Sequence, residues 1–102
     1  MLELRPSCEN CNRPLPPESL QARICSYECT FCAACVERVL ENVCPNCGGG
    51  FVPRPIRPQE AWRAGTGLVN DPPSTERRAL QYSRDEVSAL IATLRDADPA
   101  AR

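Results

Sequence analysis

Residues 8–47 read CENCNRPLPPESLQARICSYECTFCAACVERVLENVCPNC and contain all eight cysteines of the 102-residue chain. The cysteines fall into four close pairs, at positions 8/11, 25/29, 32/35 and 44/47. A short turn that carries two cysteines supplies two sulfur ligands to one ion, and a second pair completes a tetrahedral site. Four pairs therefore predict two metal sites of four cysteines each.

The residues alone leave the grouping of the pairs open. A sequential grouping joins 8, 11, 25 and 29 in one site and 32, 35, 44 and 47 in the other. An interleaved grouping joins 8, 11, 32 and 35, and then 25, 29, 44 and 47. Only Thr30 and Phe31 separate Cys29 from Cys32, so these two cysteines are expected to serve different ions in either arrangement.

The spacing of the pairs and the final Cys-Pro-x-Cys resemble those of RING-type zinc domains. A closer resemblance, to a bacterial family of small cysteine-rich proteins of unknown function, is carried by residues 1–6, 23–26, 29–32, 44–49, 54–58 and 73–77. The RING resemblance implies the interleaved grouping and two Zn²⁺ ions. The implied ligands are Cys8, Cys11, Cys32 and Cys35 in site 1 and Cys25, Cys29, Cys44 and Cys47 in site 2.

The expected fold is a small, metal-dominated α+β fold: a RING-like two-zinc domain over 1–58, a Pro/Gly-containing connector over 59–75 and a C-terminal helical segment over 76–102. Within the first part, the sequence predicts an edge strand at 1–5, a hairpin around 24–27, a helix over 36–43 and a returning strand at 51–52. The helix is expected to bury Val36, Val39, Leu40 and Val43 on one face. The apolar set is small, so we predict a domain that folds only with metal.

Two apolar features lie outside the cysteine-rich stretch. Trp62 in the connector is expected to pack against the zinc domain, with an exposed anchor for a partner as the alternative. Ser83 followed by Glu86 predicts a helix beginning at 84, because these residues form a capping box. That helix carries one apolar stripe, which we expect to dock on the zinc domain or to bind a second copy or another protein; its members are Val87, Leu90, Ile91 and Leu94.

Other uses of the cysteines fit the sequence less well. Cys29, Cys32 and Cys35 match part of a bacterial iron–sulfur pattern, but eight residues instead of three precede the Cys44-Pro45 dipeptide. No stretch is long and apolar enough to span a membrane, and the start lacks the pattern of a signal peptide. We therefore expect a cytoplasmic protein, and a reducing compartment favours metal sites over disulfides.

Closed four-cysteine sites and the absence of histidine argue against an enzyme. A ubiquitin-ligase-like adaptor, the role of many RING domains, is one alternative, but Glu9 and Gly48 depart from the usual docking residues. A nucleic-acid-binding protein is another alternative, based on Arg54, Arg57 and Arg63. The formal charge of −1 becomes −5 once eight thiolates hold two divalent ions, which disfavours phosphate binding. The preferred interpretation is a non-enzymatic zinc module for protein–protein interaction.

Overall fold

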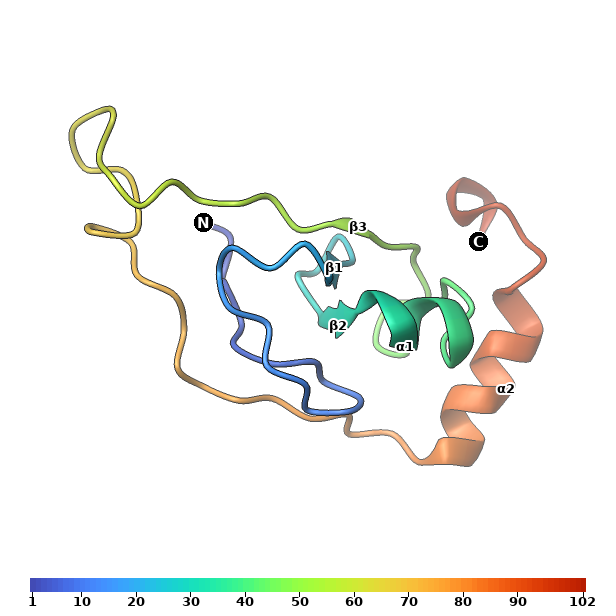
Figure 1. Ribbon diagram of the computed structural model, residues 1–102. Coiled ribbons are helices and arrows are strands. Elements are labelled where there is room, and N and C mark those ends of the chain that lie inside the picture. The colour runs from blue at the N-terminus through green and yellow to red at the C-terminus, as the bar shows by residue number, and fades with distance from the viewer.

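A three-stranded antiparallel sheet lies at the centre of the cysteine-rich region in the computed structural model, which describes residues 1–102 (Figure 1). The strands are β1 (Ala22–Ile24), β2 (Thr30–Cys32) and β3 (Val52–Pro53), in the order β2-β1-β3. Arg23 lies opposite Phe31, and Ile24 lies opposite Val52. The predicted hairpin and the returning strand are thereby confirmed.

The first helix, α1 (Ala33–Arg38), starts directly after β2, three residues before the predicted start. Its end is also earlier, because Glu41 and Asn42 adopt left-handed conformations with φ of 48° and 61°. These residues reverse the chain toward Cys44. The prediction that Val39 is buried is wrong: its side chain lies beyond the helix and is 48% exposed.

The predicted edge strand at 1–5 is absent, because other groups occupy the backbone of this segment. The carbonyl of Leu4 accepts a hydrogen bond from the Ser74 N–H at 3.0 Å. The carbonyls of Leu2 and Arg5 accept from the guanidinium groups of Arg57 and Arg54. The segment is extended, as its alternating pattern suggested. Its carbonyls, however, accept hydrogen bonds from two arginine side chains and one backbone amide instead of from a neighbouring strand.

The hydrophobic core is small and rich in sulfur. Six of its fourteen residues are cysteines. The ring of Phe31 packs edge-on against that of Phe51, with centroids 5.4 Å apart. The remaining members are Leu15, Ala22, Val36, Leu40, Val43, Val87 and Ile91. The fold class is therefore a small α+β domain organised around two cysteine clusters.

The second helix, α2 (Arg84–Leu94), begins where the capping box predicts, and the Ser83 hydroxyl accepts a hydrogen bond from the Glu86 N–H at 3.1 Å. Val87 and Ile91 are buried in the core, and the other two residues of the stripe, Leu90 and Leu94, pack against it. Figure 1 shows α2 at the end of the molecule toward which α1 runs. The apolar stripe of this helix is thus covered by the cysteine-rich unit of the same chain.

The chain between the cysteine-rich unit and α2 first forms a closed loop and then follows the N-terminal segment. The loop, residues 58–71, projects at the end of the molecule away from α2 (Figure 1) and is closed by a hydrogen bond from the Leu68 N–H to the Pro58 carbonyl. Trp62 in this loop is 71% exposed, so the expectation that it packs against the zinc domain is wrong. Beyond the loop, the Leu80 N–H donates to the Glu9 carbonyl.

A short 3₁₀ helix, η1 (Pro99–Ala101), follows α2. The guanidinium of Arg102 donates to the carbonyls of Asn42 and Gly48 at 2.9 and 2.8 Å. The C-terminal segment therefore contacts the cysteine-rich unit at both of its ends. None of the helices is long and apolar enough to cross a membrane.

Candidate metal centre

The first cysteine cluster consists of Cys8, Cys11, Cys32 and Cys35, whose four sulfur atoms all lie within 4.8 Å of one another. Cys8 and Cys11 lie on a tight turn, in which the Asn12 N–H donates to the Cys8 carbonyl. Cys32 ends β2 and Cys35 lies in the first turn of α1. The junction between strand and helix therefore presents the second pair of sulfurs to the first.

The second cluster brings the sulfurs of Cys25, Cys44 and Cys47 within 4.8 Å of one another. Cys44 and Cys47 also lie on a tight turn, closed by hydrogen bonds from Gly48 N–H to the Cys44 carbonyl and from Cys44 N–H to the Gly49 carbonyl. Cys29 lies outside this set of three, although its side chain is buried and its thiol lowers the pKa of Cys25.

The two clusters group the pairs in the interleaved way. The pair 8/11 meets the pair 32/35, and the pair 44/47 meets Cys25. Cys32 belongs to the first cluster and Cys29 does not, so the expectation that these neighbouring cysteines serve different ions stays a prediction. All eight cysteines are free thiols.

The geometry of the first cluster fits a thiolate-bound metal ion. Four sulfurs at about 2.3 Å from one tetrahedral ion lie about 3.8 Å from one another. The sulfurs of Cys11 and Cys32, which come from different pairs, are 3.8 Å apart. Little rearrangement would be needed to place an ion among them.

Five of the eight thiols have pKa values shifted from that of a free cysteine. Burial raises the pKa of the Cys35 thiol to about 12 and also raises the pKa of Cys8. Hydrogen bonds from the Cys29 and Cys44 thiols lower the pKa of Cys25 to about 3, and the corresponding bond to Cys25 raises the pKa of Cys44. The protons on these thiols therefore shift the pKa values of Cys25 and Cys44 in opposite directions. A divalent cation can replace these protons, because metal ligands must be deprotonated.

Side-chain amides contact one sulfur of the first cluster and the sulfur of Cys29, a feature that our sequence analysis missed. The Nδ2 of Asn10 donates to Cys35 Sγ, and the Nδ2 of Asn46 donates to Cys29 Sγ, each at 3.2 Å. The signal was present as a repeated Cys-x-Asn-Cys motif at 8–11 and 44–47.

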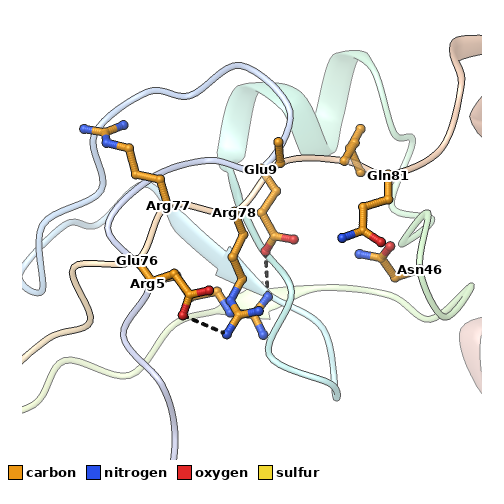
Figure 2. Close-up of a pocket in the computed structure, with 9 residues that line it drawn as sticks. Arg5, Glu9, Asn46, Glu76, Arg77, Arg78 and Gln81 are labelled. Atoms are coloured by element: carbon orange, nitrogen blue, oxygen red, sulfur yellow. Dashed lines mark hydrogen bonds and ion pairs between the residues drawn. The ribbon is translucent and has the colours of Figure 1, made fainter.

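A polar cavity of about 460 Å³ lies beside the first turn (Figure 2). Four of its five charged side chains form ion pairs: Arg5 pairs with Glu9 at 2.9 Å, and Arg78 approaches Glu76 at 3.6 Å. Glu9 is buried, and its carboxylate also accepts a hydrogen bond from the Thr30 N–H. The position that departs from the RING docking pattern thus carries an internal ion pair.

Two of the three arginines in the basic stretch are used inside the fold. Arg54 is buried, and its guanidinium donates to the carbonyls of Arg5, Leu15 and Pro16 at 2.9–3.1 Å. Arg57 donates to the carbonyls of Leu2 and Asp71. Burial lowers the pKa of Arg54, but an arginine stays charged at neutral pH. These guanidinium groups bind main-chain oxygens of the same protein.

The fold and the two sulfur clusters define a small cysteine-rich protein with two possible metal sites. Residues 1–57 match the family described as "Protein of unknown function (DUF1272)", and the chain belongs to this family. The "Uncharacterized protein R02474" of Rhizobium meliloti (strain 1021) is 62% identical over 58 residues, which cover 57% of this chain and 69% of that protein. No solved structure matches the chain.

Proposed function

We propose that this protein is a non-enzymatic zinc-binding module that holds two Zn²⁺ ions through its eight cysteines and serves in protein–protein interaction. The observation that carries the proposal is the convergence of four cysteine sulfurs, from two distant turns, within 4.8 Å. Thiolate sulfur is a preferred ligand for zinc, and a site with four such ligands is closed to substrate. A structural role follows from this donor set.

Cys29 completes the second site in this proposal. Asn10 lies in the first turn and donates to Cys35, a member of that turn's own cluster. Asn46 has the equivalent position in the second turn and donates to Cys29. The correspondence between the two turns supports Cys29 as the fourth ligand beside Cys25, Cys44 and Cys47. A small movement of its side chain toward the ion is then required on metal binding.

Metal analysis of the purified protein tests this assignment. Two zinc ions per chain are expected, with no visible absorption. The Cys29→Ser variant should retain the first site and bind the second ion more weakly, and Ser26→Ala in the same loop is the matched control. Iron with visible absorption, or a chain that binds no metal, would contradict the proposal.

An interaction role is supported by what remains exposed after α2 has docked. Trp62 and Val69 are 71% and 70% exposed in the closed loop 58–71. Aromatic residues of this kind are frequent energetic centres of protein interfaces. The internal use of Arg54 and Arg57 disfavours nucleic acid, and the buried Glu9 disfavours the ligase-like alternative. Copurification from the native host, compared between the protein and its Trp62→Ala variant, tests the interaction; an unchanged set of captured proteins would count against Trp62 as the anchor.

A further inference from the structure

The two turns that carry the Cys-x-Asn-Cys motif share not only their sequence pattern but also a side-chain hydrogen bond to sulfur. In each turn the asparagine precedes the second cysteine, and its side-chain amide donates to a sulfur. Both hydrogen bonds measure 3.2 Å between Nδ2 and Sγ. The accepting cysteine is distant in sequence in both cases, 25 residues from Asn10 and 17 residues from Asn46.

Turn geometry does not explain the choice of asparagine at these positions. Asparagine often occupies the left-handed region of backbone space, as Asn12 and Asn42 do here with φ of 66° and 61°. Asn10 and Asn46 are not among the residues with positive φ. Their side-chain amides, and not their backbone conformations, distinguish them from other residues that fit a turn.

The cysteines that accept these two hydrogen bonds are largely buried. Cys29 and Cys35 are each only 6% exposed. A buried thiolate that cannot be hydrated is costly unless another donor approaches it. Backbone amides serve other sulfurs, such as Tyr27 N–H for Cys25 and Gly49 N–H for Cys47. For Cys29 and Cys35 the side-chain amide is the N–H donor that the structure provides.

We propose that Asn10 and Asn46 are matched positioning residues, each of which orients one buried thiolate and raises the metal affinity of its own site. This inference rests on the proposed function, because it assumes that the sulfurs are metal ligands. Each amide links the turn that carries one pair of ligands to a cysteine of another pair. It therefore acts where the two halves of a site meet. Groups that hydrogen-bond to metal ligands typically contribute 10–100-fold to affinity.

The two sites provide each other's control. Asn10→Ala should weaken the first site about 10–100-fold and leave the second unchanged, and Asn46→Ala should do the reverse. Both asparagines are exposed, so neither substitution opens a cavity. The Asp variants keep the shape, lose the N–H donors and add negative charge, so they should lose more affinity than the Ala variants. Gln81→Ala is a further control: Gln81 lies beside Asn46 (Figure 2) but has no hydrogen bond to sulfur.

The affinities can be read separately in cadmium-substituted protein, in which ¹¹³Cd gives one resonance per site. Chelator competition followed at each resonance should show a selective loss in each variant. If both variants leave both affinities unchanged, or weaken both sites equally, the inference is overturned. A wild-type chain that binds two ions while the variants behave like the Gln81 control refutes only this inference. A wild-type chain that binds no metal refutes the proposed function itself.

A measurement on the unsubstituted protein avoids the question of whether variants fold. A hydrogen bond from an amide to a metal-bound sulfur transmits scalar coupling between the amide proton and ¹¹³Cd. Coupling is expected from the side-chain amide protons of Asn10 to one resonance and from those of Asn46 to the other. Its absence in protein that holds two cadmium ions would overturn the assignment.

Discussion

Gly48 lies directly beneath the side chain of Leu94: a Cβ atom added to Gly48 would come within 2.9 Å of the Leu94 Cδ1. The glycine ends the second cysteine turn, and the leucine ends α2. Gly48 also has φ of +79°, which other residues rarely adopt. The residue that permits the turn is therefore also the residue that permits close docking of the C-terminal helix.

Gly48→Ala should destabilise the protein for two reasons, its conformation and its contact with Leu94. Gly65→Ala is the matched control, since Gly65 has the same φ but would meet no atom within 4 Å. We expect about 1–2 kcal/mol from conformation in both variants and a smaller additional loss for Gly48→Ala, because the end of the Leu94 side chain must shift. Denaturant unfolding measures the difference. Adding Leu94→Ala to Gly48→Ala should recover the part of the stability loss that comes from the contact with Leu94. Equal stability losses in the two glycine variants would contradict the prediction.

Ser83→Ala should weaken α2 at its start, because the Glu86 N–H then loses its acceptor. The expected cost in the free energy of unfolding is about 0.5–2 kcal/mol. Ser88, exposed within the same helix, provides the control, since alanine is favourable there. Hydrogen exchange of the α2 amides would localise the effect. A larger loss for Ser88→Ala than for Ser83→Ala would show that the cap is unimportant.

Arg54→Lys should be destabilising although it preserves the charge. The lysine ammonium group cannot replace the planar guanidinium group, which donates to three carbonyls. Each buried carbonyl left without a donor lowers the stability of the fold by about 1–3 kcal/mol. Arg63→Lys is the control on an exposed arginine and should change stability by less than about 0.5 kcal/mol. Thermal unfolding of the metal-loaded variants compares the two. Equal melting temperatures would exclude a structural role for Arg54.

Trp62 gives a spectroscopic test of the loop 58–71, because it is the only tryptophan. With 71% of its surface exposed, it should emit close to free tryptophan in water and should be readily quenched by iodide. Unfolding should then shift the emission maximum very little. A blue-shifted, protected emission in the monomer would place the indole in a packed environment, contrary to the structure.

Chelation of the metal should unfold the cysteine-rich unit. Six cysteines belong to the fourteen-residue core, and structural zinc sites supply roughly 10–16 kcal/mol each of apparent binding free energy at neutral pH. Circular dichroism should change on addition of a strong chelator and recover when zinc is returned. Native circular dichroism in verified metal-free protein would contradict this prediction.

The sequence predicted those features whose signals are local. Ser83 and Glu86 are three residues apart, and each cysteine pair lies on one turn, so the α2 start and the four pairs could be read directly. The grouping of the pairs came from a resemblance and not from the residues. Val39 was assigned to a buried face because its spacing fits a helix, but the helix ends before it.

Features that depend on distant parts of the chain were missed. Arg54 was considered for nucleic acid, yet it reaches carbonyls 38 to 49 residues away. The extended segment at 1–5 was predicted as a strand, since the alternation of Leu2 and Leu4 does not specify which groups bind its backbone. Composition gave no means of placing Trp62, because a tryptophan in a closed loop fits both a packed and an exposed position.

The Arg54 hydrogen bonds end on main-chain oxygen atoms, which every amino acid possesses. The main-chain carbonyls of residues 5, 15 and 16 accept these hydrogen bonds whatever side chains the three residues carry. The bonds hold the N-terminal segment and the following loop beside β3. Over evolutionary time, these positions can change without loss of the hydrogen bonds, provided that the backbone path and Arg54 persist. Homologues that keep the same architecture are then expected to retain an arginine directly after β3.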